Sequence, residues 1–281
     1  MGLRAICVAV SVPALATLAC ASVDSVPASL DRGYHSMYNL QFAVAQQEFS
    51  GWEKQHPEDP LGPVSEAAGL LFSEFDRLGV LQSQLFQDDS HFDKRKKLAP
   101  DPDIHVRMET ALQRAEQRGR VALAKNPNDE NALFALALAA GLRADYTALI
   151  EKRNMASLKH TKEANAFAKK LLGIAPQYYD AYLATGISKY IVGSLVAPIR
   201  WFARLAGYEA DKQAGLKELQ LAADHGRYLA PFARILLCVA YLRDHQKDKA
   251  RELLATLRSD FPENGLFARE LVRLDTTAGR Q

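Results

Sequence analysis

Apolar side chains recur every three or four positions along this chain, which is the spacing of an amphipathic helix. The stretch 231–262 shows the pattern best, because two apolar segments at helical spacing are separated by the polar run Asp244–Asp248. Proline cannot continue a helix, so Pro262 is expected to end the second segment. Where the two helices cross, Cys238 is expected to face Ala250. No stretch alternates with period two for long enough to predict a strand, and the sequence therefore predicts an all-α fold.

The same spacing returns more than two hundred residues away, near the N-terminus. Four residues near the N-terminus have the same spacing along the chain as four residues of the 231–262 stretch. The first set is Ala45, Phe49, Trp52 and Pro57, and the second is Ala250, Leu254, Leu257 and Pro262. A small residue at the helix crossing, larger apolar residues one and two turns later and a terminating proline make up the shared pattern. This correspondence predicts an internal repeat of paired helices.

Other helices are expected wherever the apolar periodicity continues. The expected ranges are 30–54, 61–86, 104–125, 131–142, 145–172, 178–192, 210–225, 229–243, 245–259 and 266–274. The polar stretch 87–103 contains two prolines and predicts a long surface loop. Gly193 and Pro198 interrupt the pattern before a short aromatic segment, 199–205.

The hairpin at 231–262 resembles a tetratricopeptide repeat, whose unit is about 34 residues long. The resemblance is strong there, fair over 33–70 and 130–190, and poor over 193–226. It implies a helix-turn-helix repeat solenoid, a tetratricopeptide-like superhelix with extended helices and insertions. The prolines at 57, 127, 176 and 262 are unevenly spaced. We therefore expect a degenerate array of roughly four or five helix pairs.

Proteins of this family are typically non-enzymatic binders whose stacked first helices line a concave groove, so the resemblance implies a protein partner. The positions that would face the groove are mostly apolar: Phe134, Leu138, Leu183, Ile187, Tyr190, Ile235, Val239 and Leu242. Burying one such side chain is worth about 1.5–3 kcal/mol, so an uncovered strip would be unfavourable in water. The chain itself, a partner protein or an apolar small ligand could cover it.

Charged residues beside aromatic ones stand out in three places, around Glu74–Arg77, Arg143–Tyr146 and Arg200–Lys212. Ion pairs and stacked arginines that fix neighbouring helices would explain them. Three of these residues are also candidates for binding a partner protein, because Arg and Trp dominate binding hot spots. They are Arg143, Arg200 and Trp201.

Residues 1–21 differ in kind from the rest of the chain. Arg4 is their one charged residue, an apolar run broken by Pro13 follows, and Ala19–Ala21 closes it with small residues. This pattern predicts a signal peptide, with residues 22–29 as a linker, 30–275 as the solenoid domain and 276–281 as a frayed tail. Cleavage after Ala21 would release a periplasmic or secreted protein. The same site resembles a lipoprotein lipobox, in which Cys20 would be lipidated and would anchor the chain to a membrane.

Composition and motifs limit the classes of partner and of chemical activity that this chain can have. The chain has 281 residues, 48% of them hydrophobic, and a formal net charge of +2, which does not indicate a nucleic-acid partner. Loss of residues 1–21 would leave Cys238 as the one cysteine, so an internal disulfide is not expected, and Cys238 itself fits a core position. No HExxH, GxSxG, phosphate-loop or paired CxxC motif occurs, and we expect no cofactor.

Two weaker chemical candidates remain. Asp88, Asp89, His91 and Asp93 are the nearest approach to a metal cluster, but a calcium-type loop needs a glycine at its sharp turn, and this loop has none. The seven histidines are scattered and no catalytic partner can be assigned to them. The sequence thus predicts a non-enzymatic adaptor or scaffold in the bacterial cell envelope. The alternatives are a carrier of an apolar ligand in an enclosed groove and an envelope enzyme using Asp145, Tyr146 and Arg200.

Overall fold

The computed structural model describes residues 29–80, 99–194 and 209–278. Within these ranges every regular element is a helix and no strand occurs, so the all-α prediction is confirmed. The helices are α1 (Leu30–Tyr38), α2 (Phe42–Gln55), α3 (Leu61–Arg77), α6 (Pro102–Lys125), α7 (Glu130–Asp145), α8 (Asn154–Ile174), α9 (Tyr182–Ser194), α11 (Lys212–His225), α12 (Ala230–Arg243), α13 (Lys247–Asp260) and α14 (Gly265–Ala278). A π-helical turn, η1 (Tyr146–Ile150), and a 3₁₀ turn, η2 (Tyr179–Ala181), complete the list.

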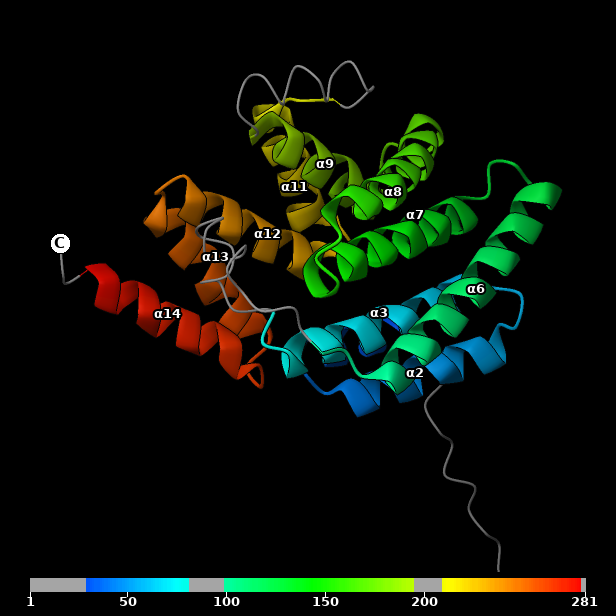
Figure 1. Ribbon diagram of the computed structural model, residues 1–281, viewed down its shortest axis with the longest axis horizontal. Coiled ribbons are helices and arrows are strands. Elements are labelled where there is room, and N and C mark those ends of the chain that lie inside the picture. Colours follow the sequence, from blue (N-terminus) through cyan, green and yellow to red (C-terminus); the bar gives the residue numbers. More distant parts are fainter. Residues whose placement is uncertain (1–28, 81–98, 195–208, 279–281) are drawn as a thin grey trace, which may run out of the picture.

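Consecutive helices pack on one another in chain order. The pairs α1 with α2, α3 with α6, α7 with α8, α9 with α11, and α12 with α13 are each in contact, and each pair also contacts the next. Figure 1 shows the resulting series, from α2 and α3 through α7 and α8 to α12, α13 and α14. The predicted contact inside the last pair is present, because the Cys238 Sγ lies 3.7 Å from the carbonyl oxygen of Ala250.

Four of the turns between pairs have the same geometry. Each starts at a residue that ends a helix with φ between −137° and −129°, and these residues are His56, Asn126, Ala175 and Phe261. In each turn the backbone N–H three positions later donates to the carbonyl of that residue, at 3.0 or 3.1 Å. A proline follows that residue in all four turns. The proline positions in the sequence therefore identify four helix ends that have equivalent structures.

The predicted single helix over 30–54 is wrong. The chain breaks at Asn39–Gln41, where Leu40 has a φ of 63°, a left-handed conformation that is uncommon for a residue other than glycine. The Asn39 side chain accepts a hydrogen bond from the backbone N–H of Glu263, and the Asn264 amide donates to the carbonyl of Tyr38. The Asn264 contact satisfies a backbone carbonyl at the break and the Glu263 contact holds the Asn39 side chain, and local sequence indicates neither.

The helix predicted over 145–172 is also wrong in part. Helix α7 continues past Gly141 to Asp145, and the π-helical turn η1 precedes the start of α8 at Asn154. Lys152 has a φ of 56° in the intervening loop. Helix α3 ends at Arg77, short of the predicted 86, and residues 81–98 lie outside the described part of the chain. Pro102, which was predicted to lie in a loop, occupies the first turn of α6 behind the N-cap Asp101.

The backbones of α9 and α11 approach each other closely. A Cβ placed on Gly215 would lie 2.5 Å from the backbone nitrogen of Tyr190 and 2.7 Å from the carbonyl oxygen of Gly186. Only glycine fits there, so α11, which lies in the region of poor repeat resemblance, is held against α9 by small residues.

One described segment, Glu130–Ile150, is long and apolar enough to cross a membrane by length and composition alone. In the structure 67% of its apolar window is buried against the rest of the protein. Phe134 and Leu133 are among its buried side chains. This burial is typical of a core helix.

Candidate binding site

A pocket of about 350 Å³ lies where several turns meet at one edge of the helix series. Its walls come from the α2–α3 turn, the segment before η2 and the α11–α12 turn, and we call it the edge pocket. The lining residues are Trp52, Asp59, Leu61, Asn131, Gln177, Tyr178, Tyr179, Asp180, His225, Arg227 and Tyr228. Aromatic rings, amides and carboxylates therefore face one concave site.

The α2–α3 turn is fixed by its own side chains. The Trp52 indole Nε1–H donates to Asp59 Oδ2 at 2.9 Å, and Asp59 Oδ1 accepts from the backbone N–H of Leu61 at 2.9 Å. The Trp52 ring also packs on His56, with ring centres 4.0 Å apart. These contacts hold Asp59 at the start of α3, where a carboxylate is favoured by the helix dipole.

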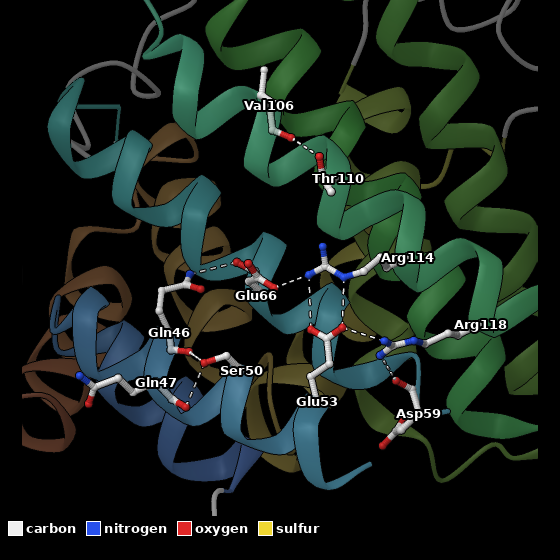
Figure 2. A network of polar contacts seen from close by, with 10 residues as sticks. All are labelled: Gln46, Gln47, Ser50, Glu53, Asp59, Glu66, Val106, Thr110, Arg114 and Arg118. Atoms are coloured by element: carbon white, nitrogen blue, oxygen red, sulfur yellow. Dashed lines mark hydrogen bonds and ion pairs between the residues drawn. The ribbon is translucent and has the colours of Figure 1, made fainter. Parts of the chain in front are cut away.

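An ion-pair network fastens this turn to α6 (Figure 2). Arg118 donates to Glu53 at 2.8 Å and to the backbone carbonyl of Asp59 at 3.4 Å. Arg114 lies between Glu53 and Glu66, with a 2.6 Å hydrogen bond to Glu66. Both arginines project from α6 toward α2 and α3, so the network sets the position of the pocket wall.

The α11–α12 turn is the exception among the turns, and Asp180 fixes it. Asp180 is buried, and its carboxylate accepts hydrogen bonds of 2.7–3.0 Å from the backbone N–H groups of Arg227, Tyr228 and Leu229. Gly226 permits this approach, since a Cβ there would lie 3.0 Å from Asp180 Oδ1 and 2.5 Å from the carbonyl of Ala222. Burial raises the pKa of Asp180, although the three N–H groups oppose the shift.

Tyrosines form the inner wall of the edge pocket. Tyr228 packs on Tyr34 of α1, with ring centres 5.0 Å apart, and on Phe134 of α7 at 6.2 Å. Tyr178 packs on Phe134 at 5.1 Å. Burial raises the pKa of Tyr228 to about 12 against the opposing effect of Arg227, and it raises the pKa of Tyr178 as well. Both phenols are therefore neutral at ordinary pH.

The rim carries one ion pair and one aromatic pair. Arg227 of the α11–α12 turn donates to both carboxylate oxygens of Asp31 in α1, at 2.8 and 2.7 Å, and its guanidinium lies 5.0 Å from the centre of the Tyr228 ring. The Tyr179 ring packs on His225 at 4.8 Å. The first helix of the chain thus contributes to the same edge as the turns.

The predicted groove residues do not form an exposed strip. Phe134 and Tyr190 are buried, at 2% and 7% exposure, and the rings of Tyr178 and Tyr228 pack on Phe134. The others are partly buried: Leu138, Leu183, Ile187, Ile235, Val239 and Leu242. The chain's own aromatic residues therefore cover at least the Phe134 end of the strip.

Arg143 lies in a second and more open pocket, of about 720 Å³, between α6, α7 and α8. It pairs with Glu109 at 3.1 Å and with Glu116. The predicted structural role of such arginines, pinning neighbouring helices, agrees with these contacts. Arg200, Trp201 and Cys20 lie outside the described residues, as does the acidic loop Asp88–Asp93.

Asp145 and Tyr146 were candidates for an enzymatic site. Tyr146 is buried and its ring stacks on His105 with centres 4.6 Å apart, while burial raises the pKa of Asp145 to about 7. Neither side chain makes a hydrogen bond within the described ranges. Within those ranges there is also no group of three side chains able to hold a metal ion.

Sequence reasoning missed the edge pocket. Trp52 was assigned to the repeat core and Tyr178 to a helix start, whereas Asp59, Asp180 and Tyr228 were not singled out. A signal was available, because large aromatic side chains occur at or beside the predicted turns, where small polar residues are usual. The sequence matches no protein-family model and no curated protein, so the geometry is the basis for a functional proposal.

Proposed function

We propose that this protein is a degenerate tetratricopeptide-like repeat protein that acts as a non-enzymatic adaptor or scaffold in the bacterial cell envelope. The main support is the set of four equivalent turns at His56, Asn126, Ala175 and Phe261, which join helix pairs packed in series. Repeats of this kind stack into a rigid framework that presents side chains from many units on one surface.

The edge pocket is the docking surface in this proposal. Trp, Tyr and Arg are the residue types that dominate binding hot spots, and the pocket contains all three. It also retains unused polar groups, because the side-chain amides of Asn131 and Gln177 and the hydroxyl of Tyr179 have no hydrogen-bond partner in the described ranges. A partner would gain both aromatic contact area and hydrogen bonds there.

Affinity capture with matched baits tests this proposal. The baits are the wild-type chain, Tyr179→Ala in the edge pocket and Met155→Ala on α8, where Met155 is 80% exposed. We expect one protein from envelope extract to be retained in stoichiometric amount by the wild type and Met155→Ala but reduced at least tenfold with Tyr179→Ala. Thermal melting of each bait must first show that all three are folded. Equal retention by the three baits, or no stoichiometric partner, would overturn the proposal.

The alternatives have separate readouts. A carrier of an apolar small molecule would show a retained mass in native mass spectrometry of the freshly purified chain.

The envelope location is tested separately, because the intact mass of the mature protein distinguishes cleavage after Ala21 from acylation of Cys20. A full-length mass retaining residues 1–21 would contradict export.

A further inference from the structure

The edge pocket contains two carboxylates that form no ion pair within the described residues, those of Asp59 and Asp180. Asp59 accepts hydrogen bonds from the Trp52 indole and the Leu61 backbone, both at 2.9 Å. Asp180 accepts from three backbone N–H groups of the α11–α12 turn. All of these donors are neutral, so they orient the carboxylates without cancelling their charge.

The nearby cations are already paired elsewhere. Arg227 at the rim donates through its Nε and Nη2 to both carboxylate oxygens of Asp31. Arg118 reaches only the backbone carbonyl of Asp59, and its charge is paired with Glu53. Asp31 and Arg227 neutralise each other as an ion pair, and burial raises the pKa of Asp180, so Asp59 is the lining carboxylate whose charge is left without a cation among the described residues. This leaves the site with an excess of negative charge.

The aromatic side chains that line the edge pocket also favour a positively charged ligand. The faces of Trp, Tyr and Phe rings carry negative electrostatic potential and attract ammonium and guanidinium groups that lie over them. Trp52, Tyr178, Tyr179 and Tyr228 line the pocket, and Arg227 shows the arrangement within the protein itself, since its guanidinium lies over the Tyr228 ring at 5.0 Å. Aromatic walls together with an unbalanced carboxylate charge select organic cations over neutral or anionic ligands.

We propose that the edge pocket binds an organic cation, an alkylammonium or guanidinium group. A volume of about 350 Å³ is at the small end of ligand sites, which fits the end of one side chain or a small free molecule. The source is either a lysine or arginine side chain of a protein or a free alkylammonium compound. Only the first source depends on the adaptor function proposed above.

The chemical class is tested with choline and its neutral isostere 3,3-dimethyl-1-butanol, which has the same shape without the charge. Isothermal titration calorimetry of the full chain at fixed ionic strength is expected to show saturable binding of choline and at least tenfold weaker binding of the alcohol. Equal affinities, or no binding of choline, would overturn the inference. Asp59→Asn is expected to weaken choline binding about tenfold.

Asp76→Asn is the matched control, because it removes the same charge from α3 outside the pocket lining, at a side chain that makes no ion pair in the described ranges. It should leave choline affinity within twofold of the wild type. If both substitutions weaken binding equally, the effect comes from net charge and the pocket assignment fails. Thermal melts establish that both variants fold.

A second pair of probes identifies the source of the cation. The peptide acetyl-Gly-Arg-Gly-amide is compared with acetyl-Gly-Gln-Gly-amide and with choline. Tighter binding of the arginine peptide than of choline, lost in Asp59→Asn, supports a basic side chain of a protein partner. Binding of choline without binding of the peptide supports a free small cation, and it would count against the adaptor function while leaving the pocket assignment in place.

Discussion

The phenolic hydroxyl of Tyr38 donates a 3.1 Å hydrogen bond to the backbone carbonyl of Tyr228, across 190 positions of sequence. Tyr38 lies on α1 and Tyr228 immediately before α12, so the bond joins the first helix to the fifth pair. Both residues are buried. The same helix supplies Tyr34 to the Tyr228 ring and Asp31 to Arg227. Helix α1 therefore ties the two ends of the series together beside the edge pocket.

Tyr38→Phe should destabilise the protein through this bond. Removing the hydroxyl leaves a buried carbonyl without its donor, which costs about 1–3 kcal/mol. The free energy of unfolding from urea titration measures the effect. Tyr241→Phe is the control, because the Tyr241 hydroxyl has no hydrogen bond in the described ranges, and its cost should stay below about 0.5 kcal/mol. Equal effects would show that the Tyr38–Tyr228 bond contributes nothing of its own.

Two glycine substitutions should act with opposite sign. Gly215→Ala would place a methyl group 2.5 Å from the backbone of Tyr190 and should cost about 1–3 kcal/mol through overpacking. Gly141→Ala in α7 meets no atom within 4 Å and should stabilise the helix by about 0.5–1 kcal/mol. Thermal or urea unfolding measures both. Stabilisation by Gly215→Ala would contradict the close crossing of α9 and α11.

Asp145 should make stability depend on pH below neutrality. Its pKa is raised by burial to about 7 from an ordinary value near 3.8. Between these values the unfolded state loses a proton that the folded state keeps, so stability falls as pH rises from about 4 to 7. Asp145→Asn removes this contribution. Urea midpoints at pH 4.5 and 7.5 should therefore show a relative gain for Asp145→Asn at the higher pH, and parallel profiles for the two proteins would be inconsistent with an Asp145 that is protonated in the folded state.

Cys238 should be unreactive in the folded protein. Burial, with a smaller effect from Glu270, raises the pKa of its thiol to about 12, and the thiolate is the reactive form. In a chain with Cys7 and Cys20 replaced by serine, a disulfide reagent at pH 8 should label Cys238 only after denaturant is added. Labelling within minutes without denaturant would show that the α12–α13 packing opens readily.

Local patterns in the sequence identified most of the helices and four of the turns. The proline-bearing turns at His56, Asn126, Ala175 and Phe261 were predicted because their signals lie within a few residues of the structure they specify. Burial of Ala45, Phe49, Ala250 and Leu257 also followed from periodicity alone. Helix ends that depend on such signals were placed to within a few residues.

Only the tertiary structure decided the break at Leu40, the π-helical turn after Asp145 and the edge pocket. At Leu40 an uninterrupted helical pattern gives way where Asn264 binds the backbone carbonyl of Tyr38 and the Glu263 backbone binds the Asn39 side chain, both from more than two hundred positions away. The pocket likewise combines Trp52 from the end of α2, Tyr178 from the segment before η2 and Tyr228 from the α11–α12 turn. Sequence periodicity reports which face of a helix is apolar, because that depends on near neighbours. Which distant turns meet, and what charge they leave unbalanced, depends on how the pairs stack in space.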